Sequence, residues 1–110
     1  MTKDALVKEV KSYLIEIKKE LGPDLFFQNI PDNFSRNLPD FLITYCGESL
    51  LLELKAKGTR PRAVKMNILT HLKLAGNMAE WADSIDKAKD MINILVFNVP
   101  KKTRENNHLH

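Results

Sequence analysis

Apolar residues recur every three or four positions near the start of the chain. The set comprises Leu6, Val10, Tyr13, Leu14, Ile17 and Leu21. On a helix this spacing gathers the side chains into one stripe, so the pattern predicts an amphipathic helix over residues 3–21. Gly22-Pro23 ends that helix, because proline cannot extend the hydrogen-bond ladder and restrains the residue before it.

The middle of the chain changes from helical spacing to short runs rich in strand-forming residues. Residues 25–29 predict a short strand, and residues 30–39 contain two prolines, which predicts an ordered loop. Residues 40–45 and 50–57 are dense in Leu, Ile, Phe, Thr and Tyr and flank a turn at 46–49. These two runs predict a β-hairpin.

The remaining pattern predicts a second helix, a further strand and a third, short helix. The second helix runs from Val64 to Ala75 and is capped by Gly76-Asn77, the strand covers 78–82, and the short helix starts at Asp83 or Ser84 and continues through Met91. The apolar run 94–99 is either an extra edge strand or a continuation of the third helix. Residues 100–110 are polar, and we expect a loosely ordered tail.

Composition narrows the class of protein. A chain of 110 residues fits a single domain, here expected to cover residues 1–110. A single cysteine, Cys46, cannot form an internal disulfide, and no apolar run approaches the roughly 20 residues that span a bilayer. We therefore expect no membrane contact and a cytoplasmic location. The formal net charge of +3 favours an anionic partner without naming it.

The leucine-rich run 50–56 contains two charged residues that a buried strand should not carry. Side chains alternate along a strand, so Glu53 and Lys55 project from one face together. If the hairpin pairs residue 40 with residue 53 or with residue 55, Asp40 joins them on that face. A slip of one residue would separate the three groups.

Two carboxylates and an ammonium on one buried face allow two interpretations. Asp40 and Glu53 suit a hard divalent cation such as Mg²⁺ or Mn²⁺, with Lys55 beside the metal-bound water. Such a metal would polarise a phosphoryl oxygen and lower the pKa of its water, which is the chemistry of phosphodiester hydrolysis. The alternative is an internal ion pair between Lys55 and one of the carboxylates.

The spacing of these residues resembles a nuclease signature. Pro39-Asp40 followed by Glu53-Leu54-Lys55 is similar to the PD-(D/E)xK motif, in which an aspartate opens one hairpin strand and E-x-K occupies the next. The stretch 37–88 resembles the VRR-NUC branch of that superfamily. Its further motifs read here as Ala56-Lys57-Gly58, Leu72-Lys73-Leu74-Ala75-Gly76 and Ser84-Ile85-Asp86-Lys87-Ala88.

The resemblance implies an α/β restriction-endonuclease-like fold with an αβββαβ core and a mixed central sheet flanked by helices. It implies a metal bound by Asp40, Glu53 and the Leu54 carbonyl, with Lys55 assisting the water. Lys65 stands where the family has a glutamine, and we expect it to contact phosphate. The family also places a glutamate of the first helix near the metal, and Glu9 fits that position better than Glu16 or Glu20.

Basic residues beside the motif predict contacts with a phosphate backbone. The expected DNA-binding residues are Lys57, Arg60, Arg62 and Lys65, with Arg36. Such contacts contribute affinity that depends on salt and not on base sequence. One small site cuts one strand, so two-fold pairing would suit a branched substrate, and the apolar run 94–99 is a possible interface. The resemblance implies a homodimer that cuts four-way junctions.

The leading hypothesis is therefore a Mg²⁺- or Mn²⁺-dependent, structure-selective DNA endonuclease of recombination or repair, in a bacterial or phage-infected cell. A second hypothesis is a non-catalytic DNA-binding module that keeps the nuclease fold, with Lys65 marking decay of the site. A third is a restriction-type nuclease that cuts a defined duplex sequence.

Overall fold

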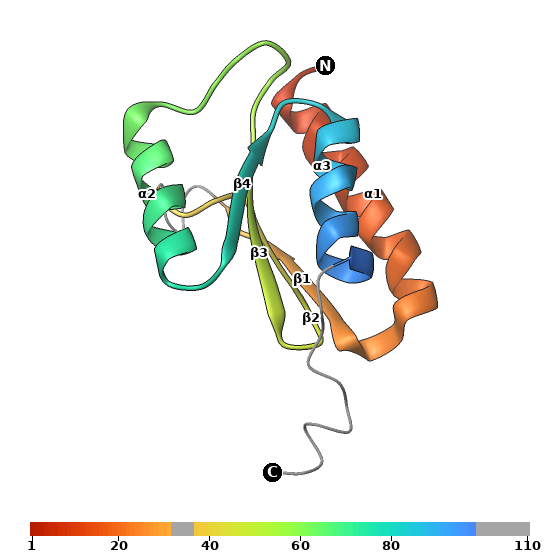
Figure 1. The fold of residues 1–110 in the computed structure, drawn as a ribbon. Coiled ribbons are helices and arrows are strands. Elements are labelled where there is room, and N and C mark those ends of the chain that lie inside the picture. The colour runs from red at the N-terminus through yellow and green to blue at the C-terminus, as the bar shows by residue number, and fades with distance from the viewer. Residues whose placement is uncertain (32–36, 99–110) are drawn as a thin grey trace.

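The computed structural model describes residues 1–31 and 37–98. Four strands form one sheet, with helices on both of its faces (Figure 1). In chain order the elements are α1 (Lys3–Leu21), η1 (Gly22–Asp24), β1 (Leu25–Asn29), β2 (Phe41–Tyr45), β3 (Glu48–Leu54), α2 (Ala63–Leu74), β4 (Met78–Ala82), α3 (Ile85–Asn93) and η2 (Ile94–Asn98). The expected α/β fold with a mixed sheet is confirmed. None of the helices in the described ranges is long and apolar enough to cross a membrane.

Helix α1 has the predicted bounds. Its apolar stripe is buried against the sheet and α3, with Leu6, Val10 and Leu14 nearly inaccessible to solvent. The Thr2 side chain caps the helix by accepting a hydrogen bond from the Ala5 amide. The chain leaves the helix through Gly22 at a φ of 75°, a left-handed conformation that glycine adopts without strain.

The sheet has the order β1-β2-β3-β4. Strands β1, β2 and β3 are antiparallel, and β4 runs parallel to β3. The hairpin turn is tighter than predicted, because β3 begins at Glu48 and only Cys46 and Gly47 turn the chain. Both have positive φ, 51° and 83°, the conformation that two-residue hairpin turns require. Strand β3 also ends at Leu54, three residues before the predicted end.

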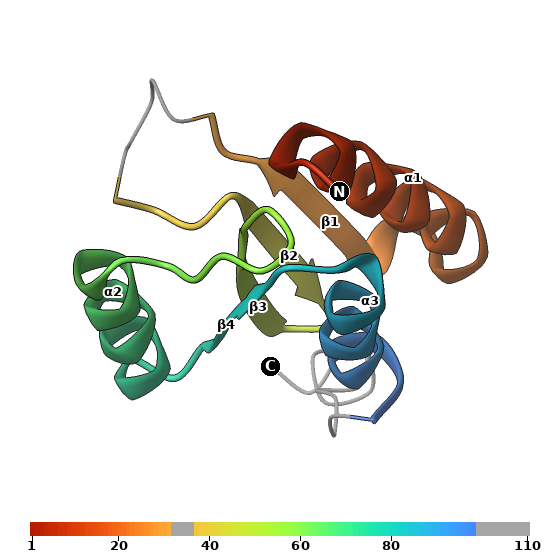
Figure 2. The same ribbon diagram turned by 90° about the horizontal axis from the view of Figure 1, so that it is seen from above.

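The helices divide unequally between the two faces of the sheet. Helices α1 and α3 cover one face, and α2 covers the other (Figure 2). The larger core lies under α1, α3 and η2 and includes Leu50, Leu52 and Leu54 of β3. The smaller core lies under α2, where Leu51 packs against Leu69 and Ala79. The site begins where this smaller core ends.

The described part of the apolar run, residues 94–98, does not form an edge strand. Residues 94–98 form a π-helix, η2, that continues α3, and its Leu95 and Val96 are buried in the larger core. Ile94 and Phe97 are exposed. The two readings of this run are thus resolved in favour of the helix. Val99 and the expected tail, 100–110, lie outside the described residues, as does Arg36.

Candidate metal and phosphate site

Asp40 lies at the entrance to β2 with its side chain turned inward. The ladder pairs Phe41 with Leu52, so the next position places Asp40 opposite Glu53, one of the two expected registers. Asp40 is 5% exposed, and its Oδ2 atom accepts a hydrogen bond of 2.7 Å from the Leu54 amide. This bond fixes the carboxylate and leaves its Oδ1 atom for a cation.

Glu53 is the most buried charged residue in the described part of the chain, at 2% exposure. Its side chain leaves β3 on the α2 side of the sheet, beyond Leu51. Burial and the negative charge of Asp40 raise the pKa of the Glu53 carboxyl, and the ammonium groups of Lys65 and Lys3 oppose that rise. The site therefore holds a carboxylate whose charged form is costly without a nearby cation.

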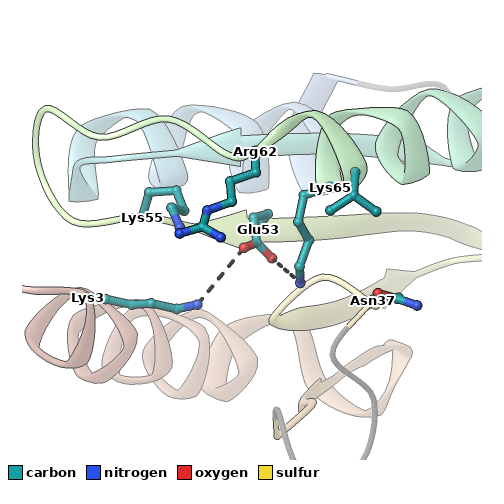
Figure 3. A pocket seen from close by; sticks show the side chains of 7 residues that line it. Lys3, Asn37, Glu53, Lys55, Arg62 and Lys65 are labelled. Atoms are coloured by element: carbon teal, nitrogen blue, oxygen red, sulfur yellow. Dashed lines mark hydrogen bonds and ion pairs between the residues drawn. The ribbon is translucent and has the colours of Figure 1, made fainter.

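A cavity of about 450 Å³ opens over Glu53 (Figure 3). We call it the carboxylate cavity; it is lined by Lys3, Asn37, Glu53, Lys55, Arg62, Val64 and Lys65. Four of these seven residues are basic, and Glu53 is the only acidic one. The lining of the cavity is thus positively charged overall, a composition that attracts an anionic ligand.

Lys55 and Arg62 are the two basic residues of the cavity lining whose charge no described carboxylate neutralises. Among the described residues, neither side chain has an ion-pair or hydrogen-bond partner. In Figure 3 the ends of both side chains lie beside Glu53, on the opposite side from Lys65. Lys57 and Arg60 are exposed on the same loop but do not line the cavity. The segment that follows β3 thus carries two basic residues that line the cavity and two exposed basic residues that do not.

The loop that carries these residues is tied down at two points. The Lys57 amide donates to the Met1 carbonyl at 3.2 Å, and the Gly58 amide donates to Asp83 Oδ2 at 3.2 Å. Asp83 also pairs with Lys87 at 2.9 Å, and these bonds, the one from Lys87 first, lower the pKa of the Asp83 carboxyl. The basic residues are therefore presented by an anchored loop.

Lys65 does not point toward open solvent. Its ammonium contacts Glu53 Oε1 at 3.3 Å and donates to the Leu38 carbonyl at 2.8 Å. The side chain of Lys65 is 19% exposed. It thus binds the carboxylate that was expected to bind metal, and it ties the start of α2 to the segment before Asp40.

The first helix contributes Lys3 to the site, which the sequence reading missed. The Lys3 ammonium lies 3.0 Å from Asp40 Oδ1 and 4.0 Å from Glu53 Oε2. Glu9, expected near the metal, is exposed and does not line the cavity. Six residues along a helix turn the side-chain direction by about 240°, so the face that carries Lys3 to the carboxylates points Glu9 elsewhere.

A signal for Lys3 was present in the sequence. Lys3 stands seven residues before Val10, two helical turns along the same buried stripe. A charged residue on such a stripe must lie beyond the core or meet an opposite charge. Its partners stand 37 and 50 positions later in the chain, which is why the spacing alone did not reveal them.

Comparison with known proteins identifies the architecture. No protein-family model and no curated protein match the sequence. Among solved structures, one described as a "VRR_NUC domain protein" superimposes with a TM-score of 0.63 and 20% identity, over 94% of this chain and 98% of the other. The chain has the VRR_NUC fold. A second structure, "VRR_NUC domain", has a TM-score of 0.62 and 19% identity, over 84% of this chain and 97% of the other.

Superposition on VRR_NUC domains extends along nearly the whole described chain, so the expected fold resemblance is confirmed. At 20% identity the similarity establishes the arrangement of helices and strands, and it does not establish the chemistry of the site. The chemistry depends on this chain's own side chains, above all on the two carboxylates and the lysines that contact them.

Proposed function

We propose that the protein is a divalent-metal-dependent DNA endonuclease that acts on branched DNA. The observation that carries the proposal is the proximity of two buried carboxylates, Asp40 and Glu53, of which Glu53 lines a cavity. The same cavity is lined by Lys55 and Arg62, which have no ion-pair partner among the described residues. Carboxylates can bind a metal ion, and nearby basic side chains can bind the phosphodiester on which that metal acts.

The donor set fits Mg²⁺ or Mn²⁺. One ammonium, that of Lys3, already contacts both carboxylates, so the two acids are close enough for one cation to touch both. The described residues contain no group of three or more His, Cys, Asp and Glu side chains that could hold a metal. Mg²⁺ is often held by one or two carboxylates and keeps waters and substrate phosphate as its other ligands. In this proposal the backbone carbonyl of Leu54 is the third metal ligand that the protein supplies.

Each residue then has a role. When bound, the metal would polarise the phosphate and acidify a water. Asp40, held by the Leu54 amide, and Glu53 would hold the cation. Lys55 orients the water or neutralises the charge that develops on the phosphate. Arg62 binds the backbone, and the exposed Lys57 and Arg60, with Arg36, extend this contact; Lys65 holds Glu53 in place.

The test uses labelled four-way junction, flap and linear duplex DNA, with Mg²⁺, with Mn²⁺ and with chelator. We expect cleavage that requires metal, prefers the branched substrates and is lost in Asp40→Asn. A matched Asp86→Asn variant, which removes an exposed carboxylate of α3, should cut normally. Full activity of Asp40→Asn would contradict the proposal, and a reproducible cut in linear duplex would identify a restriction-type enzyme.

Light scattering of the sample with and without junction tests the expected homodimer.

A non-catalytic DNA-binding module is the second candidate. The observation that favours it is charge balance: Lys3 and Lys65 together neutralise Asp40 and Glu53 without any metal. Binding of the junction that is unchanged by chelator, with no product at any metal concentration, would establish this alternative and exclude the nuclease.

A further inference from the structure

Lys3 occupies an unusual position for a lysine at the start of a helix. Its side chain is 33% exposed, yet its ammonium contacts the two most buried carboxylates of the described chain. Thr2 caps the helix on one side of it, and the Met1 carbonyl accepts the Lys57 amide. The helix start is thus anchored to the basic loop, and Lys3 is held over the carboxylates by its backbone.

The two lysines bracket Glu53 from opposite oxygens. Lys65 contacts Oε1, whereas Lys3 lies on the side of Oε2 (Figure 3). The Lys3 ammonium also pairs with Asp40 Oδ1. Among the described residues, only Lys3 forms an ion pair with both acids, so its ammonium lies where a cation shared by Asp40 and Glu53 must lie. A divalent ion and this ammonium cannot both occupy that place, because like charges a few ångströms apart repel strongly in a buried site.

We propose that Lys3 gates the metal site: its ammonium holds the two carboxylates in the absence of metal and must leave before a divalent cation binds. This inference rests on the proposed function. Lys3 also lines the carboxylate cavity, so a phosphate in the cavity offers the displaced ammonium a new partner. Metal and DNA backbone therefore bind cooperatively, and by linkage each strengthens the other equally.

The experiment measures Mn²⁺ binding to the full chain without DNA, by calorimetry and by the electron paramagnetic resonance of free Mn²⁺. We expect weak binding by the native protein and binding tighter by at least about tenfold in Lys3→Met. Lys3→Arg keeps the charge and should bind as weakly as the native chain. Lys8→Met removes an exposed charge from the same helix and should leave binding unchanged. Adding Asp40→Asn to Lys3→Met should abolish the gain.

A second variant guards against loss of folding. Lys3→Gln keeps a polar side chain, and its binding can be followed as the Mn²⁺-dependent rise in the urea midpoint. The gate is overturned if Lys3→Met and Lys3→Gln bind Mn²⁺ no better than the native chain, or if the gain survives Asp40→Asn. Cleavage of junction DNA is scored separately: cleavage without a Lys3 effect overturns the gate alone, whereas a Lys3 effect without cleavage overturns the nuclease and keeps the gate.

Discussion

The two faces of strand β3 carry side chains of different chemistry. Leu50, Leu52 and Leu54 face α1 and α3, and each is fully buried in the larger core. On the other side, Leu51 meets a small cluster under α2, and the next side chain is the buried carboxylate Glu53. The same seven-residue strand thus contributes apolar burial on one face and a buried carboxyl group on the other.

This difference separates stability from function within one strand. Apolar burial stabilises the fold in proportion to the area removed from water. A buried carboxylate beside a second one opposes folding unless cations compensate it, and natural sites keep such groups where chemistry needs them. Substitutions on the apolar face should therefore lower stability, whereas substitutions on the carboxylate face should lower activity.

The largest expected effect is on catalysis and comes from the carboxylate side. Glu53→Gln keeps the shape of the side chain and removes its charge, so metal-dependent cleavage should fall by at least about a thousandfold, since a bound metal supplies several kcal/mol of transition-state stabilisation. Junction cleavage in Mg²⁺ measures the loss, and the circular dichroism spectrum should stay unchanged. Cleavage within about tenfold of the native rate would break the assignment.

The next effect is on stability and comes from the apolar side. Leu52→Ala should lower the free energy of unfolding by about 2–5 kcal/mol, because it opens a cavity in the larger core. Leu51→Ala should cost less, since Leu51 is 8% exposed and its cluster is thin. Urea unfolding of both variants gives the comparison. An equal or larger cost for Leu51→Ala would mean that the α2 side carries the fold as well.

A pH series sharpens the contrast at Glu53. Its pKa in the folded protein is raised above 4.5, so between 4.5 and that raised pKa the folded state binds more protons than the unfolded one. The contribution of Glu53 to stability is therefore full below this window and is lost as pH rises through it. Glu53→Gln lacks the effect, so its stability relative to the native chain should increase across the window.

The measurement is urea unfolding of native and Glu53→Gln protein, with chelator present, at steps between about pH 4 and pH 8. Comparing the two chains at each pH removes the contributions of other groups. A constant difference across the series would mean that Lys3 and Lys65 fully offset the burial of Glu53 and the charge of Asp40.

Much of the fold follows from local patterns. The stripe of α1, the strands and the grouping of Asp40 with Glu53 are set by periods of 3.6 and 2 and by the position of one turn. The turn itself was misjudged because Cys46 takes a positive φ, which side chains seldom adopt. The run that forms η2 is apolar and β-branched, so its spacing could not separate helix from strand.

The candidate site was predictable only where its residues are close in sequence or share a hairpin. Glu53 and Lys55 are two positions apart, and the register brings Asp40 to them. The contacts of Lys3 with Asp40 and of Lys65 with Leu38 depend on how α1 and α2 pack on the sheet. Packing of that kind is a tertiary property, which is why the sequence pattern did not reveal the contacts of Lys3.

The smallest expected effect concerns the rim of the carboxylate cavity. Arg62 has no acidic partner among the described residues, so Arg62→Gln should leave the fold unchanged and weaken junction binding uniformly across sequences. The slope of log affinity against log salt should fall by about 1, the value for one lost phosphate contact. Lys11→Gln, which removes an exposed charge from α1 away from the cavity lining, is the matched control and should keep the native slope. Equal slopes for the two variants would mean that the DNA backbone does not contact Arg62. The rim of the carboxylate cavity would then have no part in DNA binding.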